Sequence, residues 1–366
     1  MAEYLVILIW PAIVAGLTHL SGKKTGIKIL NKIEYRYSFF TLIIAVIPLV
    51  YYTANRNLYF GDTYSYMHTF NNMPSSMSGL TDYMATVTKD EFFYYGSALI
   101  RIFLTDKYTT YFAILAIFHI TCLLIVYQKY SESAFLSLFL FLASTDYISW
   151  MYNGIRQFVA VCLTFLCFGL ILKKKFIPAI IIVAFASFFH GSALIVIPFI
   201  IIAQGKAWNK NTMLFIFGII IALTFLEEFT SILDTALEDT QYTNVVSDWQ
   251  GSDDDGTNFI RVFIYSIPAI LSLYGRKKIN SVNNPIINLC TNMSIASAGL
   301  YIISMFTSGI YIGRLPIYFS LYNYILLPWE ITHLFQKDVG KSITVIMIIA
   351  YIGYYFYSLK FGFGLI

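Results

Sequence analysis

Apolar stretches of about 17–25 residues recur along the whole of this 366-residue chain. That length lets an α-helix cross the hydrocarbon core of a bilayer, because each residue adds about 1.5 Å. A transmembrane barrel would instead show short segments of alternating polarity. Hydrophobic residues make up 58% of the chain and charged residues 12%, whereas soluble domains carry roughly 25% charge. The sequence therefore excludes a soluble enzyme and a disordered protein, and predicts an all-α polytopic membrane protein.

The distribution of positive charge predicts the topology. Lysines and arginines gather in six loops, and all six fall on one face only if 176–203 is a hairpin of two short helices with His190 at its outer tip. We therefore expect about twelve transmembrane helices with both termini outside. One long tilted helix over 176–203 is the alternative. The basic loops are 23–36, 129, 173–175, 206–210, 276–278 and 337–341.

We expect residues 1–366 to form one integral membrane domain with two outward-facing segments, 54–107 and 227–258. The first contains an amphipathic stretch, Glu91–Phe103, which we expect along the outer interface. The second holds nine acidic residues and no lysine or arginine. Its Asp253–Asp255 cluster has oxygen ligands suited to calcium but lacks the spacing of a calcium-binding loop. We therefore expect a solvated acidic loop there.

Metal and cofactor chemistry finds little support in the sequence. The four cysteines lie in or beside apolar runs, and none forms a CxxC pair near a histidine, so we expect buried free thiols and no structural zinc. A phosphate-binding GxxxxGK[ST] loop is absent, so ATP hydrolysis is not expected. We predict no cofactor and no metal ion. The first apolar run lacks a basic start and a cleavage site, which favours a first span over a signal peptide.

Ionisable side chains in or beside the spans mark a candidate site. A charge at the centre of a transmembrane helix costs about 2.5–3.5 kcal/mol, so such residues are candidates for function when they face a polar cavity. In the twelve-helix topology six ionisable groups map to the outer face, which predicts a single outward-facing polar site. They are Arg56, Asp62, Glu91, Arg156, His190 and Arg314.

Two arginines in this set have surroundings suited to phosphate. Arg156 lies in Asn153–Gln157 (NGIRQ), which opens a helix whose free backbone N–H groups favour an anion. Arg314 lies in a second segment bracketed by glycines, Gly309–Pro316. Two arginines can clamp a pyrophosphate through bidentate contacts. The alternative for each is a snorkelling interface anchor.

The other ionisable groups suggest acid–base and sugar chemistry. His190 at the hairpin tip suits a general base or a hydrogen-bond donor, and its alternative is an interface histidine with satisfied hydrogen bonds. Asp62 precedes Tyr64 and Tyr66, and sugar sites often combine carboxylates with aromatic faces. Its alternative is a turn-stabilising aspartate. Glu91 suits either the site or the cap of the helix that it opens.

Four segments, in order along most of the chain, resemble the EpsG-like family of bacterial polysaccharide polymerases, relatives of the Wzy O-antigen and capsule polymerases. The IRQ and FHxSAL elements are the most specific. The segments are RNLYFGDTYSY at 56–66, NGIRQ at 153–157, FFHGSAL at 188–194 and GRLPIYF at 313–319.

The resemblance implies a multi-spanning fold similar to the C-type glycosyltransferases. It also implies an enzyme of the bacterial cytoplasmic membrane whose active site faces the periplasm or cell exterior. Such a polymerase joins oligosaccharide repeat units carried on undecaprenyl pyrophosphate, which serve as both donor and acceptor. The implied partners are these lipid-linked glycans, membrane lipid, a chain-length regulator and a flippase of the same pathway, with no nucleic acid.

The resemblance also implies roles for individual residues. Arg156, Arg314 and Gln157 would bind the pyrophosphate. His190 is the first candidate for the base that deprotonates the acceptor hydroxyl, with Asp62 or Glu91 second. The implied substrate-binding residues are Arg56, Tyr64, Tyr66, Asn153 and Tyr318. The alternatives are an O-antigen ligase, a flippase or transporter of lipid-linked sugars, and a membrane O-acyltransferase.

Overall fold

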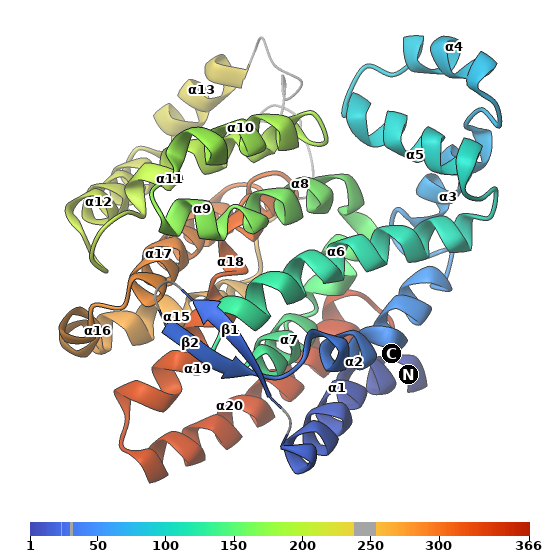
Figure 1. Cartoon of the computed structure of the whole chain (residues 1–366). Helices are drawn as coiled ribbons and strands as arrows, with labels where there is room; N and C mark the ends of the chain where they lie inside the picture. Colours follow the sequence, from blue (N-terminus) through green and yellow to red (C-terminus); the bar gives the residue numbers. More distant parts are fainter. Residues whose placement is uncertain (23, 30–31, 238–253) are drawn as a thin grey trace. The chain divides into compact units, whose positions relative to one another are not determined.

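The computed structural model describes residues 1–22, 24–29, 32–237 and 254–366 (Figure 1). The described chain is almost entirely helical, which confirms the predicted all-α class. It divides into two compact units. The first comprises 1–168, 181–193 and 338–366, and the second comprises 169–180 and 194–337. A single membrane domain over 1–366 stays a prediction.

The first unit is built around α6, which packs against α2 and α8, while α1 packs against α2 and α7. Serine caps fix two helix starts, since Ser38 accepts a hydrogen bond from the Phe40 N–H and Ser133 from the Leu136 N–H. Its helices are α1 (Ala2–Ser21), α2 (Phe39–Ala54), α3 (Thr63–Asn72), α4 (Leu80–Ala85), α5 (Glu91–Phe103), α6 (Tyr108–Tyr130), α7 (Ala134–Ala143), α8 (Ile155–Leu166), the larger part of α10 (Phe176–Ser187) and α20 (Lys337–Tyr357).

The second unit is built around α17, the most buried of the long apolar helices. It packs against α12, α15 and α19. It starts with Asn284 as a side-chain cap and Pro285 in the first turn, where the missing N–H of proline costs nothing. The helices are α9 (Phe168–Leu172), α11 (Val196–Ile202), α12 (Lys210–Thr224), α13 (Leu226–Leu237), α15 (Phe259–Tyr274), α16 (Arg276–Val282), α17 (Pro285–Phe306), α18 (Ile317–Ser320) and α19 (Asn323–Leu334).

Several helices are long and apolar enough to cross a bilayer, as expected of a multi-pass membrane protein. Five described helices qualify alone, and up to eight spans result if each of three bent helix pairs counts as one. Shorter apolar helices cover Phe39–Ala54, Phe176–Ser187 and Gly191–Ile202. The count of twelve stays a prediction. The five are Ala2–Ser21, Tyr108–Tyr130, Ile155–Leu172, Pro285–Phe306 and Lys337–Gly362.

The stretch 176–203 is broken where the hairpin interpretation requires a break. Helix α10 ends at Ser187, and a 3-10 helix over Gly191–Ile195 leads into α11. His190 lies in the break. Two short helices therefore replace one long one, although a membrane hairpin at this place stays a prediction.

The basic loop 23–36 contains a feature that the sequence analysis did not predict. Strands β1 (Thr25–Ile29) and β2 (Lys32–Arg36) pair antiparallel, with Thr25 opposite Arg36. Both strands alternate apolar and polar residues, the period expected of a strand. The apolar residues lie on opposite faces of the hairpin, since Ile27 is opposite Glu34, and only β1 buries one of them, Ile29. The positive charge of this loop served to predict the membrane topology, and its alternation of polar and apolar residues was not used to predict strands.

The outward segment 54–107 is largely helical. Its amphipathic part has the predicted bounds, Glu91–Phe103, as α5. Phe93 and Ala98 of α5 are buried in a core with Phe70 of α3 and Tyr111 of α6. This face of α5 is therefore covered by protein, and the interfacial location of α5 stays a prediction.

The two termini belong to the first unit and lie close together (Figure 1). The Tyr355 hydroxyl, near the end of α20, donates a hydrogen bond to the Tyr4 carbonyl at the start of α1, with an O–O distance of 2.9 Å. It also lies 2.8 Å from the Tyr147 hydroxyl. This arrangement is what an even number of spans requires.

Candidate functional site

Asn153 joins two of the predicted site segments in the first unit. Its side-chain oxygen accepts a hydrogen bond from the Asp62 N–H at 3.2 Å, and its carbonyl accepts one from the Tyr66 hydroxyl at 3.0 Å. Gly61 has a φ of 49°, and a Cβ there would overlap the Asn153 amide. Only glycine therefore allows the start of α3 to approach the start of α8 this closely.

Arg156 lies in the first turn of α8, where backbone N–H groups have no helical partner. Its Nη1 donates to Asp90 Oδ2 at 2.7 Å, and its guanidinium lies 5.7 Å from the Tyr94 ring centre. About a third of its side chain is exposed, against 6% for Asp90. A guanidinium has five N–H donors. Arg156 can therefore bind an anion while Asp90 holds it in place.

Asp90 is a candidate site residue that the sequence analysis missed in favour of its neighbour Glu91. It precedes the first residue of α5 and has a left-handed φ of 53°, which is uncommon outside glycine. Burial raises the pKa of Asp90 above its ordinary value, while Arg156 and Lys89 oppose the rise. Asp90 has the sequence position of an N-cap residue, yet its side chain makes no capping hydrogen bond and pairs with Arg156 instead, which the sequence does not signal.

His190 and Gln157 meet at Ser192. His190 Nδ1 shares a hydrogen bond with Ser192 Oγ at 2.7 Å, and Gln157 Nε2 donates to the same oxygen at 3.4 Å. Ser192 belongs to the FFHGSAL segment but was not singled out from the sequence. The contact with Ser192 therefore orients the imidazole of His190 through Nδ1.

The turn that carries His190 also contacts the start of α5. The Phe92 N–H donates to the Phe188 carbonyl at 3.3 Å, and the two rings lie 4.9 Å apart. On the other side, the Phe60 ring lies 5.9 Å from Phe363, so the Gly61–Asp62 turn is beside the end of the chain. The first unit thus gathers the starts of α3, α5 and α8 with the turn after α10.

Arg56 has a different setting from the other predicted site residues, because it is buried. Its Nε donates to Thr63 Oγ1 at 3.1 Å, its Nη1 donates to the Thr53 carbonyl at 2.8 Å, and its guanidinium lies 3.8 Å from the Phe112 ring centre. Burial lowers the pKa of Arg56 to about 10. These contacts tie the end of α2 to the start of α3, which favours a positioning role.

The two remaining candidate carboxylates, Asp62 and Glu91, and the candidate Tyr64 are accessible. Asp62 and Glu91 are exposed, and Tyr64 is 56% exposed with its ring stacked on His68. Both carboxylates can therefore meet a ligand from solvent. Their roles stay predictions.

Arg314 and Tyr318 belong to the second unit. Arg314 is exposed at the end of a 3-10 helix, Ile312–Arg314, whereas Tyr318 is buried in α18. Pairing of Arg314 with Arg156 on one pyrophosphate stays a prediction. Tyr318 lies where only a ligand that enters the protein interior would meet it.

Asp254 holds the loop that leads to Arg314. Its carboxylate accepts hydrogen bonds from Ser308 Oγ at 2.6 Å, the Gly309 N–H at 2.9 Å and the Ile310 N–H at 3.1 Å. Burial raises the pKa of Asp254, but these hydrogen bonds outweigh it and lower the pKa below its ordinary value. Asp254 is therefore partly buried and tied to the turn before Arg314, whereas Asp255 is exposed and Asp253 lies outside the described residues.

Two glycines of the Gly309–Pro316 segment are explained by the same loop. A Cβ on Gly309 would come within 2.8 Å of the Gly256 backbone, and one on Gly313 within 2.5 Å of Thr257 Oγ1. Residues 254–257 therefore pack directly against the turn before Arg314. The glycines serve close packing, which sequence spacing alone does not reveal.

The cysteines and candidate metal ligands add no further site. All four cysteines are buried and free of disulfides, as expected. No cluster of three or more histidine, cysteine, aspartate or glutamate side chains able to hold a metal ion occurs among the described residues.

Comparison with known proteins identifies a family for this chain. A family model described as the EpsG family matches residues 39–363, from the start of α2 to just beyond α20. No curated protein and no solved structure shows significant similarity. Because the matched region is nearly the whole chain, the protein belongs to the EpsG family, which is linked to exopolysaccharide biosynthesis.

Proposed function

We propose that this protein is a polysaccharide polymerase. It joins polyprenyl-pyrophosphate-linked oligosaccharide repeat units by glycosyl transfer at the outer face of the bacterial cytoplasmic membrane. The observation that carries the proposal is the clustering, within one unit, of the segments around Asp62, Arg156 and His190 through Asn153 and Ser192. These segments are far apart in sequence, and each contains a candidate for one step of glycosyl transfer.

The leaving group is a lipid pyrophosphate, whose negative charge grows as the glycosidic bond to it breaks. Arg156 supports this step because its guanidinium is accessible and fixed by Asp90. The first-turn N–H groups of α8, which have no partner within the helix, add partial positive charge at the same place. Preorganised donors of this kind lower the barrier without reorganising during the reaction. Arg314 is the proposed second cation.

The acceptor hydroxyl must lose a proton as the new bond forms. His190 is the proposed base, since Ser192 orients its ring from the Nδ1 side. Asp62 and Glu91 are the second candidates and are exposed. Binding donor and acceptor together in one site supplies an entropic advantage. The pyrophosphate ester carries the driving force, so the reaction consumes no ATP.

The proposal includes a fold similar to the C-type glycosyltransferases, with twelve spans and the site facing outward. The contact between Phe60 and Phe363 supports it, because the charge distribution predicts the site and the C-terminus on the same side. The proposed partners are the undecaprenyl-pyrophosphate-linked glycan as donor and acceptor, a chain-length regulator and a flippase.

The decisive experiment is the surface-glycan length profile of the source cell with this gene deleted and then restored. Polymerisation as the missing step predicts loss of the long-chain ladder while single repeat units still reach the surface. Restoring the intact gene must return the ladder. Loss of the single units as well would indicate export or transfer by an O-antigen ligase, and would contradict the proposal.

A further inference from the structure

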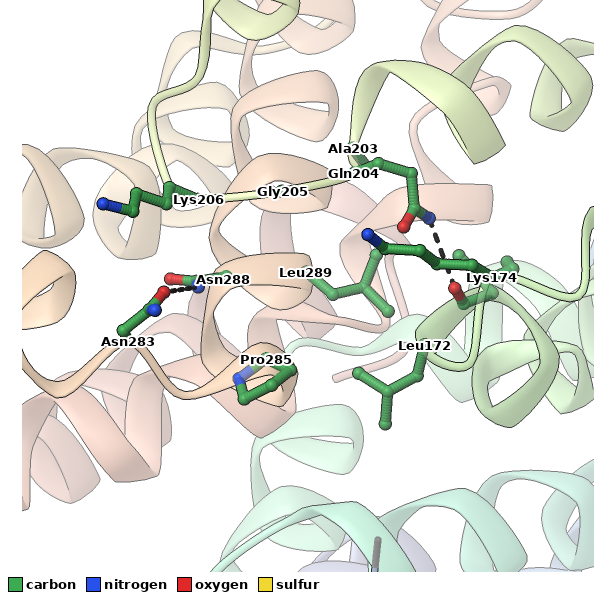
Figure 2. Close-up of a pocket in the computed structure, with 11 residues that line it drawn as sticks. Leu172, Lys174, Ala203, Gln204, Gly205, Lys206, Asn283, Pro285, Asn288 and Leu289 are labelled. Atoms are coloured by element: carbon green, nitrogen blue, oxygen red, sulfur yellow. Dashed lines mark hydrogen bonds between the residues drawn. The ribbon is translucent and has the colours of Figure 1, made fainter.

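A pocket of about 280 Å³ with both apolar and polar lining residues lies in the second unit, where the ends of α9 and α11 meet the start of α17 (Figure 2). No residue of the proposed active site lines it. Among the described residues that line it, none is acidic and two are lysines. Its polar lining consists of Lys174, Gln204, Lys206, Asn283 and Asn288. The composition therefore favours a ligand with negative charge.

The two lysines come from different loops, 173–175 and 206–210. Lys174 has a left-handed φ of 56° just beyond the end of α9, a position where glycine is usual because a side chain costs strain there. Figure 2 shows the Lys174 side chain lying beside the pocket and the Lys206 side chain pointing away from Lys174. A four-carbon stem allows a lysine ammonium to reach a bound anion from such a start.

Asn288 provides the second, independent indication of a ligand. Its side chain is 3% exposed, and its Nδ2 donates to Asn283 Oδ1 at 2.9 Å. Its Oδ1 is buried with no hydrogen-bond partner among the described residues. Buried polar atoms are nearly always satisfied, so this oxygen, in a residue that lines the pocket, calls for a donor from a water or from a ligand that reaches it. A hydroxyl group supplies one.

Gln204 offers a second acceptor oxygen at the pocket, beside that of Asn288. Its Nε2 donates to the Ile200 carbonyl at 2.9 Å and to the Ile171 carbonyl at 3.3 Å. Both of its N–H groups are therefore engaged, and its oxygen is the atom with which it can contact a ligand. The pocket thus combines cations for a phosphate with acceptors for hydroxyl groups.

The start of α17 adds positive potential. This helix has 22 residues and begins at Pro285, which lines the pocket. The first turn of a long helix carries a partial positive charge that favours phosphate. Leu172 and Leu289 cover the apolar part of the wall, which suits the carbon skeleton of a phosphate ester.

We propose that this pocket binds the phosphoglycerol head group of an anionic membrane lipid. Pockets for drug-sized ligands have volumes of about 300–1,000 Å³, so a pocket of about 280 Å³ suits a head group better than a nucleotide sugar or an oligosaccharide. Its lysines belong to loops that the charge pattern predicts at the inner face, where basic pockets between helices take anionic head groups. The inference does not depend on the proposed polymerase activity.

The test measures lipids retained by the full-length protein. Native mass spectrometry follows the protein in detergent with equal amounts of phosphatidylglycerol and phosphatidylcholine. We expect the wild type to retain phosphatidylglycerol, and Lys174→Gln with Lys206→Gln to weaken it about fivefold or more for each lysine removed. Lys173→Gln with Lys175→Gln is the matched control, because these exposed neighbours do not line the pocket.

A further variant tests the hydroxyl contact. Asn288→Leu removes the unpaired acceptor, so we expect weaker phosphatidylglycerol binding and unchanged binding of phosphatidic acid, which lacks the glycerol hydroxyls. If this buried substitution prevents folding, the exposed lysine pair still decides the question. Equal phosphatidylglycerol retention by the lysine variant and its control would overturn the assignment.

Soluble glycerol 1-phosphate distinguishes the source of the head group. A lipid ligand predicts that millimolar glycerol 1-phosphate leaves bound phosphatidylglycerol in place. Lysine-dependent binding of glycerol 1-phosphate without retention of the lipid would keep the site and make its ligand a soluble phosphate ester. Binding of neither probe would contradict the site.

Discussion

At the scale of single residues, Arg156 combines an ion pair with accessible N–H donors. Asp90 is nearly covered and Arg156 is not, so the carboxylate fixes the arginine from the protein side and leaves the other side for a ligand. Asp90 itself adopts a left-handed backbone conformation, and non-glycine residues in that region cluster at functional sites. Ser192 similarly fixes the orientation of the His190 imidazole through a hydrogen bond to Nδ1.

The arginine contact makes a direct prediction. Arg156→Lys keeps the charge but loses the planar fork that binds phosphate through two parallel hydrogen bonds. We expect the amount of long-chain polymer to fall about tenfold or more, the loss of roughly one strong contact. Immunoblots of membranes must show unchanged protein, and Arg36→Lys in the β1–β2 hairpin is the control. If the Arg156→Lys variant makes nearly as much long-chain polymer as the wild type, Arg156 is an interface anchor and does not bind the pyrophosphate.

At the scale of elements, helix starts and the turns before them build the candidate site. Helix α8 follows a π-helical turn, Tyr147–Asn153, that is bent by 73° from α7. Such insertions are frequent at functional sites because they redirect a chain within a span. The turn delivers Asn153 to the Gly61–Asp62 segment and leaves the first N–H groups of α8 without helical partners.

Gly61 tests whether this junction matters. Gly61→Ala places a Cβ on the Asn153 amide at a left-handed φ, so we expect a loss of about 1–3 kcal/mol of stability together with reduced polymer. Gly96→Ala is the matched control, because it lies within α5 with open space around it, and alanine favours a helix by about 1 kcal/mol. Thermal unfolding in detergent compares the two. Equal unfolding temperatures would show that the junction tolerates a side chain.

The hydrogen bonds of the Asp254 carboxylate join the segment before α15 to the loop after α17, and they predict that the stability of the protein depends on pH. The pKa of Asp254 in the folded protein lies below the ordinary value of 3.8, so its hydrogen bonds contribute stability above that value. This contribution is lost as pH falls through the folded pKa. We expect wild type to unfold at a higher temperature than Asp254→Asn at neutral pH, with the difference shrinking below about pH 4. Asp255→Asn, an exposed neighbour, is the control, and a pH-independent difference would contradict this account.

At the scale of the whole molecule, the topology links the fold to the proposed function. The hydrogen bond between Tyr355 and Tyr4 places both termini together and favours an even number of spans. Among the described residues, the five to eight candidate spans and the three shorter apolar helices make at most eleven, one fewer than the twelve that positive charge predicts. The break at His190 decides the predicted count, because 176–203 adds two spans as a hairpin and one span as a single tilted helix.

Cysteine labelling on intact cells tests this topology. Phe188 is 55% exposed in the turn before His190, and Lys210 is exposed at the start of α12. An impermeant thiol reagent should label Phe188→Cys from outside and leave Lys210→Cys unlabelled. The four native cysteines are buried, so background labelling is low. The reverse pattern would overturn the twelve-helix topology and remove His190 from an outward site.

Hydropathy and charge, read along the sequence, predicted the helical class, the places of most apolar helices and the bounds of α5. These properties are local, because any helix of about twenty apolar residues meets the same bilayer. The motif segments were also found by sequence, since each is contiguous. The β1–β2 hairpin escaped because its short alternating strands lie in a loop that was considered only for its charge.

The contacts between those segments were decided by the tertiary structure alone. Asp90 and Arg156 are 66 residues apart, Asp62 and Asn153 are 91 apart, and Asp254 and Ser308 are 54 apart. No sequence period links such pairs, because each depends on how helices pack and on where a glycine allows close approach. The sequence thus determined which residues can carry the chemistry, and packing decided which of them meet.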